Sequence, residues 1–361
     1  MIKCPLTGSN NTKIIYEQKS VPLIQNKVYP TQGEAKNAQC IDVVIAQSLD
    51  NGFVFSAGFQ DTIIDYDMHY QNEQSNSDYF RQHLAHVIEI MQANQTLQGK
   101  VVEIGCGKAY FMDMLLERGV DIIGFDPTYE GDSPRVIKDF FSDKYAGVGA
   151  AFIILRHTLE HISQPFDFIK TIAAANNYNG KIYIEVPTFK WIIENNAVED
   201  IFYEHCNYFT LETLQMFFTK STGGHFFNGQ YIYVIADLKD VNVEIIKREC
   251  KLYEIKFKER LIEYNQLINN KQGVAVWGAG AKGSTFLNLL DKENKKVKCV
   301  VDINPKKQHQ YVGGTGHYII KPGELQEYEI ENIVLMNINY IDEIRSATEP
   351  LGINLLTLQI L

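Results

Sequence analysis

The chain has 361 residues, more than one ordinary domain holds, so we expect two or three domains. Its 34 basic and 44 acidic residues give a formal net charge of −10, which argues against binding to a nucleic-acid backbone. No apolar run is long enough to cross a membrane, and the first thirty residues contain no apolar signal-peptide core. Six cysteines without paired spacing argue against a disulfide framework. We therefore expect a cytoplasmic enzyme that acts on a small molecule.

Residues 1–75 combine weak periodicity with short apolar runs and turn residues, which predicts a small β-rich module. Two later segments, 100–127 and 273–305, share one pattern: an apolar strand, a glycine-rich turn, a helix, a second strand and an acid. This alternation predicts parallel, doubly wound sheets. The sequence thus predicts an α/β protein with two Rossmann-like domains, at 76–238 and 272–361. Further strands are expected at 151–157, 181–187 and 231–238.

Between these two domains, apolar residues from Ile246 to Ile268 recur in steps of three and four. That spacing predicts one long amphipathic helix over 241–270. We interpret residues 239–271 as a connector that packs on one or both sheets.

The first glycine-rich turn, Gly105-Cys106-Gly107, follows a strand and opens a helix, where free backbone N–H groups favour ligand binding. It lacks the G-x-G-x-x-G spacing that a dinucleotide pyrophosphate needs. S-adenosylmethionine has no pyrophosphate and carries a sulfonium cation, so the acid Glu103 before the turn suits it. Asp126, at the end of the next strand, is placed for the ribose hydroxyls. The alternative is a bare strand–turn–helix corner with glycines for packing. We expect Cys106, in the cofactor loop, to be a small filler and not a nucleophile.

The second turn does fit G-x-G-x-x-G, with Gly278, Gly280 and Gly283, and Asp302 follows about twenty residues later. Taken alone, this pattern indicates NAD and an oxidoreductase. A helix N-terminus beside Lys282 would also suit an anionic group such as a diphosphate. A third alternative is a degenerate Rossmann domain that only packs against its neighbour.

Several motifs in order resemble the three-domain sugar-nucleotide C-methyltransferases, within the class I S-adenosylmethionine-dependent methyltransferases. The matching stretches are VEIGCGKAYF (102–111), FDPTYEG (125–131), RHTLEHISQP (156–165), IEVP (184–187), EHCNYFT (204–210), WGAGAKGSTFLN (277–288), VVDINPKKQH (300–309) and INYIDEI (338–344). The resemblance implies S-adenosylmethionine as methyl donor, S-adenosylhomocysteine as product and a nucleotide-linked keto-deoxysugar as acceptor. It places Pro127, beside Asp126, and His157 among the cofactor contacts.

Two departures from that family matter. Its N-terminal module usually holds zinc with two C-x-x-C pairs, but here Thr7 and Val43 stand where the partners of Cys4 and Cys40 would be. Two cysteines cannot complete a four-ligand site, so we expect no metal. In addition, the family's Tyr-His before Glu-His reads Phe202-Tyr203 here, which leaves the acceptor atom open between carbon and oxygen.

Carbon methylation beside a keto group needs a base and a donor to the developing enolate. The resemblance places His205 at the family's base position, and imidazole titrates near neutral pH. Glu204 would orient it or hold a sugar hydroxyl. Tyr203 and Tyr70 are candidate enolate donors, with ordinary packing as the equal alternative.

His157-x-x-Glu160-His161 also matches a zinc-peptidase signature with both histidines on one helical face, but no third ligand is evident in the sequence. We assign His157 and Glu160 to the walls of the pocket. Gly278, Gly280, Lys282, Asn339 and Tyr340 are expected to contact the acceptor.

The sequence therefore favours a methyltransferase that uses S-adenosylmethionine and methylates carbon, with O-methylation as the close alternative. Two further classes of protein stay open: a nicotinamide-dependent oxidoreductase, and a non-catalytic binding protein with a relic cofactor site. The oligomeric state is also left open.

Overall fold

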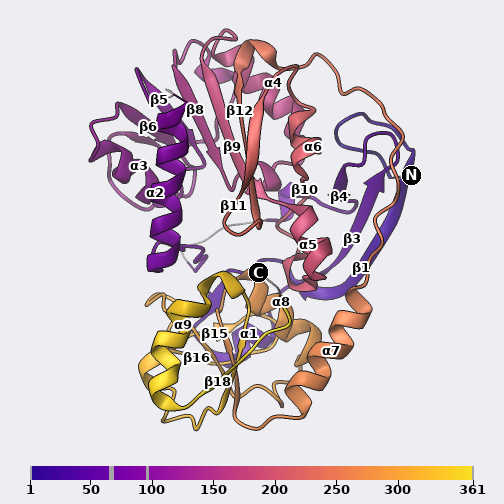
Figure 1. Cartoon of the computed structure of the whole chain (residues 1–361), viewed down its shortest axis with the longest axis vertical. Helices are drawn as coiled ribbons and strands as arrows, with labels where there is room; N and C mark the ends of the chain where they lie inside the picture. The colour runs from indigo at the N-terminus through magenta and orange to yellow at the C-terminus, as the bar shows by residue number, and fades with distance from the viewer. Residues whose placement is uncertain (1, 65–68, 95–96, 360–361) are drawn as a thin grey trace.

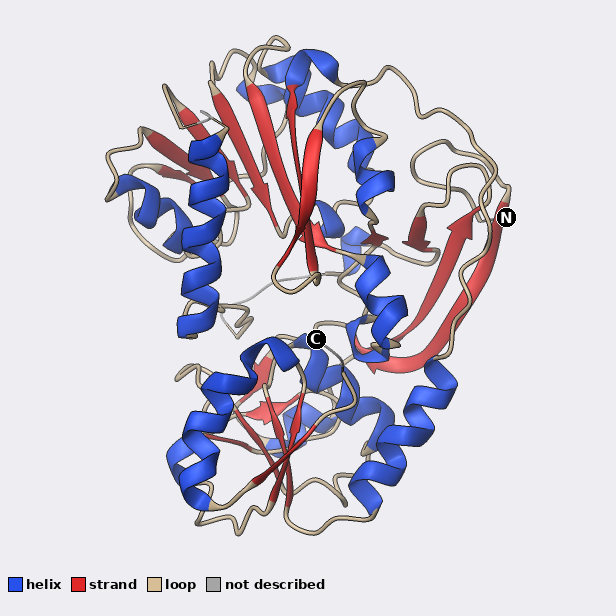
Figure 2. Cartoon of the chain, in the orientation of Figure 1, coloured by secondary structure: helices blue, strands red, loops and turns tan. Residues whose placement is uncertain are grey.

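The computed structural model describes residues 2–64, 69–94 and 97–359. A large sheet with helices on both faces occupies the upper part of Figure 1, and a smaller sheet flanked by helices lies below it. A curved antiparallel sheet runs along the right-hand side, as the strand colouring of Figure 2 makes clear. Within the described residues, every helix is too short or too polar to serve as a bilayer span.

The large sheet has seven strands in the order β11-β12-β9-β8-β5-β6-β7. Strands β5 to β9 pair in parallel, and β12 is antiparallel to both of its neighbours. The bounds are β5 (Val101–Ile104), β6 (Ile122–Phe125), β7 (Val136–Ile137), β8 (Phe152–Arg156), β9 (Lys181–Pro187), β11 (Thr222–Phe226) and β12 (Tyr231–Asp237). The strands expected near 151–157, 181–187 and 231–238 are confirmed as β8, β9 and β12.

Successive side chains of the central strands point to opposite faces of this sheet, so a separate hydrophobic core forms on each face. Phe152 and Ile154 of β8 face one core, and Ile153 and Leu155 face the other. The first core includes side chains of α2 (Asp78–Ala93) and α3 (Tyr110–Leu116), and the second includes those of α4 (Pro165–Ala175) and α6 (Leu211–Gln215). Because both faces are covered, the strands read as nearly continuous apolar runs.

The smaller sheet has five strands in the order β16-β14-β13-β17-β18, and all neighbours pair in parallel. The bounds are β13 (Val274–Trp277), β14 (Cys299–Val301), β16 (Ile319–Ile320), β17 (Asn332–Leu335) and β18 (Asn354–Leu356). Helices α7 (Phe257–Asn269) and α8 (Ala281–Leu290) pack in one core and α9 (Ile341–Thr348) in the other. The expected mixed α/β fold with parallel sheets is confirmed.

The N-terminal segment is β-rich as expected, but it does not close its sheet on its own. The antiparallel sheet comprises β1 (Thr12–Pro22), β3 (Cys40–Ser48), β4 (Val54–Ser56) and, as its last strand, β10 (Asn207–Tyr208). A second pairing joins β2 (Val28–Tyr29), which precedes helix α1 (Gln32–Lys36), to β15 (Tyr311–Val312). The segment therefore pairs with strands from later parts of the chain, outside the two larger sheets, and the boundary expected at residue 75 stays a prediction.

Cys4 and Cys40 lie at opposite ends of β3. Cys40 begins the strand, whereas the Cys4 thiol accepts a hydrogen bond at 3.7 Å from Asn51, just past the strand's end. A strand of this length spans roughly 25–30 Å, so these two thiols cannot share one metal ion.

The long helix predicted over 241–270 is wrong in its first half. Only Phe257–Asn269 is helical, whereas Ile246, an expected core position, is 75% exposed. Residues 241–256 run in an irregular path along the antiparallel sheet. The amide of Cys250 donates to Leu49, and the Gln47 side chain bonds to both Lys251 and Tyr253. These long-range hydrogen bonds replace the intrahelical ones.

Candidate functional site

A cavity of about 300 Å³ lies between the carboxyl ends of the seven-stranded and five-stranded sheets. In each sheet the strand order reverses beside its first strand, β5 or β13, and parallel sheets bind ligands at such switch points. Residues that follow β8 and β9 form one wall, and residues that follow β13, β14 and β17 form the opposite wall. The lining includes His157, Glu160, His161, Phe202, Glu204, His205, Gly278, Gly280, Lys282, Asp302, Lys307, Asn337 and Tyr340.

His205 lines this cavity with its ring packed on Phe202, whose centroid lies 4.1 Å away, and edge-on to His161 at 4.9 Å. Burial, together with the neighbouring His161, His157 and Lys282 charges, holds the pKa of His205 well below 6.5. The ring is therefore unprotonated at neutral pH and can accept a proton.

Glu204 also lines the cavity, but it does not orient His205. Its carboxylate accepts a hydrogen bond of 2.7 Å from the Gln25 backbone and interacts with Tyr70, another cavity residue. Burial raises the pKa of Glu204 to about 7, against the opposing effect of the Gln25 hydrogen bond. Its backbone carbonyl accepts a 2.8 Å hydrogen bond from His161 Nδ1.

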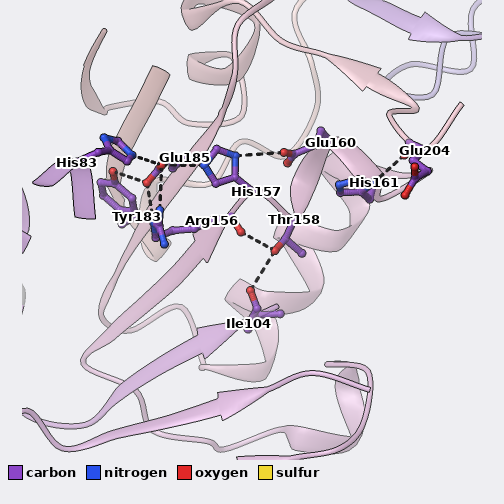
Figure 3. Close-up of polar contacts among 10 residues, drawn as sticks. All are labelled: His83, Ile104, Arg156, His157, Thr158, Glu160, His161, Tyr183, Glu185 and Glu204. Atoms are coloured by element: carbon purple, nitrogen blue, oxygen red, sulfur yellow. Dashed lines mark hydrogen bonds and ion pairs between the residues drawn. The ribbon is translucent and has the colours of Figure 1, made fainter. Parts of the chain in front are cut away.

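A buried polar network lies behind the cavity wall (Figure 3). Glu185 on β9 contacts Arg156 at 2.8 Å, His83 at 3.0 Å and His157 at 3.0 Å, so three positive or protonatable groups share one carboxylate. Burial alone would raise the pKa of Glu185, but Arg156 and His83 outweigh it and hold that pKa well below 4.5. His157 also lies 3.6 Å from Glu160. The two carboxylates outweigh the effect of burial and raise the pKa of His157 to about 9.

The shared helical face that the peptidase signature would require for His157 and His161 is not formed. His157 adopts a left-handed backbone conformation with φ of 46° directly after β8. The following Leu159–His161 segment is a single 3₁₀ turn. As a result, His157 faces Glu185, whereas His161 faces His205.

The first glycine-rich turn lies at the carboxyl edge of the seven-stranded sheet, beside the cavity but outside its lining. Gly105 packs so closely on Thr158 that an added Cβ would meet the hydroxyl at 2.1 Å. Asp126 accepts a 2.8 Å hydrogen bond from Gly107 N, and Pro127 after it is exposed. Cys106 is buried, which raises its thiol pKa above the usual range and agrees with an unreactive filler.

Glu103 fits a cationic, adenosine-bearing cofactor at this turn. The side chain is 2% exposed, and its Oε2 atom has no hydrogen-bond partner within the described part of the chain. Burial raises the pKa of Glu103 to about 7, although Arg156 opposes the shift. A buried carboxylate oxygen without a donor is costly, and a bound ammonium, sulfonium or hydroxyl would relieve that cost.

The second glycine-rich turn lines the cavity directly through Gly278 and Gly280. Lys282 lines it too, but its ammonium is already 2.8 Å from Asp200 and lies over the Trp191 ring. Asp200 therefore already offsets the Lys282 charge, and the expected role of Lys282 as an anion ligand stays a prediction. Lys307 lies in the VVDINPKKQH stretch but was not among the expected site residues; it is 4% exposed, with its ammonium 3.1 Å from the Ala279 carbonyl.

Two more expected roles are contradicted by where the side chains point. Tyr203 is fully buried, packs on Phe59 and accepts a 2.8 Å hydrogen bond from Gln60 N, so it lies outside the cavity. The Asn339 amide donates to Gln230 at 2.8 Å and to the Phe227 carbonyl, which makes it a bridge between the two larger sheets. Tyr340, which was expected in the same role, does line the cavity, and so does its neighbour Asn337.

Comparison with known families finds two matches along the chain. Residues 76–221 match a family model described as "Methyltransferase domain", and residues 270–356 match one described as "C2185-like, N-terminal". The protein is a methyltransferase.

The chain is also similar to the C-methyltransferase NovU of Streptomyces niveus, with 22% identity over 317 residues that cover 76% of each chain. Among solved structures, a SAM dependent methyltransferase from Archaeoglobus fulgidus is 17% identical, with a TM-score of 0.35, 44% of this chain and 99% of that chain covered. The plantazolicin methyltransferase BpumL in complex with SAH is 12% identical, with a TM-score of 0.36, 45% of this chain and 85% of that chain covered.

Proposed function

We propose that this methyltransferase adds a methyl group to a carbon atom of a nucleotide-linked keto-deoxysugar. The observation that carries the proposal is the cavity between two sheet switch points, with an unprotonated His205 on one wall and the second glycine-rich turn on the other. The likeness to a C-methyltransferase supports attack by carbon. We further propose residues 76–238 as the methyltransferase domain and 272–361 as the Rossmann-like domain for the nucleotide part of the acceptor, joined by 239–271 and preceded by the module 1–75.

In this proposal S-adenosylmethionine supplies a methyl group on a sulfonium sulfur and leaves as S-adenosylhomocysteine. His205 removes the proton from the carbon beside the keto group, and the electron pair of that C–H bond becomes the enolate that forms the new C–C bond. Glu204 in its protonated form donates to the Tyr70 oxygen, and the Tyr70 O–H then donates a hydrogen bond to the enolate oxygen. Glu103 and Asp126 hold the cofactor, and Glu160 contacts the sugar.

Lys307, and not Lys282, is the cation for the diphosphate in this proposal. It lies under the turn of Gly280, whose added Cβ would be 3.9 Å from the Lys307 ammonium. Burial lowers the pKa of Lys307, partly offset by Asp302 and Glu204, and an approaching diphosphate would restore the charged form.

O-methylation is the second candidate, because Phe202 gives the base an apolar neighbour where the C-methyltransferases that this chain resembles have a tyrosine. Incubation with ¹³C-methyl S-adenosylmethionine and nucleoside-diphosphate keto-deoxysugars separates the two. We expect a ¹³C signal at the shift of a methyl group on carbon. A methoxy signal would establish O-methylation, and no transfer to any such acceptor would contradict the sugar assignment.

His205→Asn tests the base. We expect turnover to fall by about 10²–10⁴-fold, while the dissociation constant for S-adenosylhomocysteine stays within about twofold. Turnover that survives the substitution would mean that another group removes the proton.

A further inference from the structure

Glu160, His161 and His205 form a cluster on the cavity wall that the proposed reaction only partly uses. One ligand atom from each of the three side chains lies within 4.8 Å of the other two. Two imidazoles and one carboxylate make the ligand set of open, mononuclear sites for zinc and related divalent metals. This set differs from the peptidase signature, because His205 takes the place of His157 beside Glu160 and His161.

His161 is oriented as a metal-bound imidazole usually is. Its Nδ1 atom is 2.8 Å from the Glu204 carbonyl oxygen, which can only accept a hydrogen bond. In the neutral ring the hydrogen therefore lies on Nδ1, and Nε2 keeps its lone pair. A backbone carbonyl that fixes the ring in this way is the usual outer contact of a histidine ligand.

Glu160 contributes a buried oxygen that lacks a donor. The side chain is 2% exposed, and while Oε1 lies 3.6 Å from His157, Oε2 has no hydrogen-bond partner among residues 2–64, 69–94 and 97–359. A buried acceptor of this kind costs about 1–3 kcal/mol when it stays unpaired. A cation held between Glu160 and the two imidazoles would satisfy it.

A rival cluster, His83, His157 and Glu185, satisfies the same distance criterion. There, however, the Arg156 guanidinium contacts the Glu185 carboxylate at 2.8 Å and 3.2 Å (Figure 3). A metal ion at that cluster would face a buried positive charge on its only anionic ligand. Around the first cluster the nearby Lys282 is neutralised by Asp200.

We propose that Glu160, His161 and His205 bind one divalent metal ion of the zinc class, with its remaining coordination positions open to the cavity. Metal binding takes the His205 lone pair, so the metal-loaded enzyme does not methylate; this second part rests on the proposed role of His205 as base. From the sequence we expect no metal, because Cys4 and Cys40 lack partners, but that argument concerns a different part of the chain.

The direct test is titration of the full-length, chelator-treated protein with Co²⁺, a spectroscopic substitute for Zn²⁺. We expect one Co²⁺ per chain with the visible d–d absorption of a four- or five-coordinate ion. Glu160→Gln, which keeps the side-chain shape, and His161→Ala should each weaken binding by at least about tenfold. His309→Ala, at a half-exposed histidine outside the cluster, is the matched control and should bind Co²⁺ normally. His83→Ala should also bind normally.

Three results would overturn the site: no Co²⁺ bound by the wild-type protein, unchanged binding in the Glu160→Gln and His161→Ala variants, or loss on His83→Ala alone. Thermal melting of every variant checks that it is folded. In a separate assay, Zn²⁺ should stop methyl transfer by the wild-type enzyme, and a chelator should restore it. Metal binding without inhibition would leave the site intact and contradict the role of His205 as base.

Discussion

The two glycine-rich turns of this protein share nearly the same backbone device. In the first, Asp126 accepts 2.8 Å hydrogen bonds from Gly107 N in the turn and from Thr128 N two residues after the acid. In the second, Asp302 accepts bonds of the same length from Ala279 N and from Asn304 N. Each acid therefore ties the turn after the first strand to the end of the second strand.

The surroundings of the two turns differ sharply in charge. Two residues before its first glycine, the first turn has the buried Glu103, whereas the second has Val276. Beneath the second turn lies the buried ammonium of Lys307. The shared backbone geometry therefore does not select the ligand. The nearby charges do, and they suit a cation at the first turn and an anion at the second.

Of the differences between the two turns, we expect the largest in cofactor affinity when Asp126 and Asp302 are each replaced by alanine. Asp126→Ala should weaken S-adenosylhomocysteine binding by about 100-fold, because two hydrogen bonds from ribose hydroxyls to a carboxylate are lost. Asp302→Ala should leave that affinity within about twofold. Isothermal titration calorimetry measures both constants.

Asp302→Ala is a matched control because it frees a turn amide just as Asp126→Ala does. A similar loss of affinity in both variants would mean that the effect comes from general loosening. If neither variant loses affinity, the first turn is not the cofactor site.

The two lysines near the second turn should respond differently to methionine. Lys307→Met should raise the KM for a diphosphate-linked acceptor by about 10–100-fold, since a charge-assisted contact is lost. Lys282→Met should instead lower the free energy of unfolding by about 2–3 kcal/mol, because Asp200 is left mostly buried and unpaired.

Steady-state kinetics and urea unfolding of both variants make the distinction. The double variant Lys282→Met/Asp200→Asn should recover much of the lost stability. A large KM effect from Lys282 and none from Lys307 would return the anion site to Lys282, where the sequence placed it.

Glu103 should make stability depend on pH. Its folded pKa of about 7 lies above the ordinary 4.5, so the folded state binds this proton more tightly than the unfolded state does. Glu103 therefore adds to the free energy of unfolding in full below about pH 4.5, and this stabilisation, on the order of 3 kcal/mol in total, is lost as the pH rises to 7. Glu103→Gln should remove this part of the slope between pH 5 and 7.

The measurement is urea unfolding at several pH values without cofactor. Glu204 shifts in the same direction, so the quantity to compare is the difference between the wild-type and Glu103→Gln curves. A difference that does not vary with pH would contradict the shifted pKa. The second turn, with Val276 at this position, contributes no such slope.

Local patterns in the sequence predicted the strands and both turns, because a strand–glycine–helix corner is specified by neighbouring residues. The strands β8, β9 and β12 followed from short apolar runs between turn residues. Residues 241–256 could not be predicted in this way. Their period of three and four is helical, but Gln47, some 200 residues earlier in the chain, bonds the backbone of Lys251 and Tyr253 and holds it in an irregular path.

The sequence predicted single residues of the candidate site, but it did not predict which of them contact one another. His205 and Glu160 were singled out from motifs, yet nothing in the sequence indicated that they meet at one point of the wall. The Lys282–Asp200 pair joins residues 82 positions apart, so a lysine beside a glycine-rich turn looked free to bind an anion. Tyr203 was misjudged because its neighbours Phe202 and Glu204 do line the cavity, while its own ring packs against the N-terminal segment.

The smallest expected effect is a change in the free energy of unfolding that comes from backbone strain. The residues that precede α3 and α8 differ in this strain. Ala109, before α3, has a φ of 65°, whereas Gly280, before α8, has an ordinary φ of −86°. A left-handed conformation costs the folded state about 1–2 kcal/mol at a residue with a Cβ. Glycine avoids this cost, but it also makes the unfolded chain more flexible, which cancels part of the gain in stability. Ala109→Gly should therefore raise the free energy of unfolding by about 1 kcal/mol.

Gly107→Ala is the reverse substitution in the same turn. Gly107 has a φ of 54°, and an added Cβ would meet no atom within 4 Å, so only the backbone cost applies. The Gly107→Ala substitution should lower the free energy of unfolding by about 1 kcal/mol. Urea unfolding of both variants checks the pair. If both changes lower stability, the methyl group of Ala109, which is 1% exposed in the core beside α3, contributes more through packing than its backbone conformation costs.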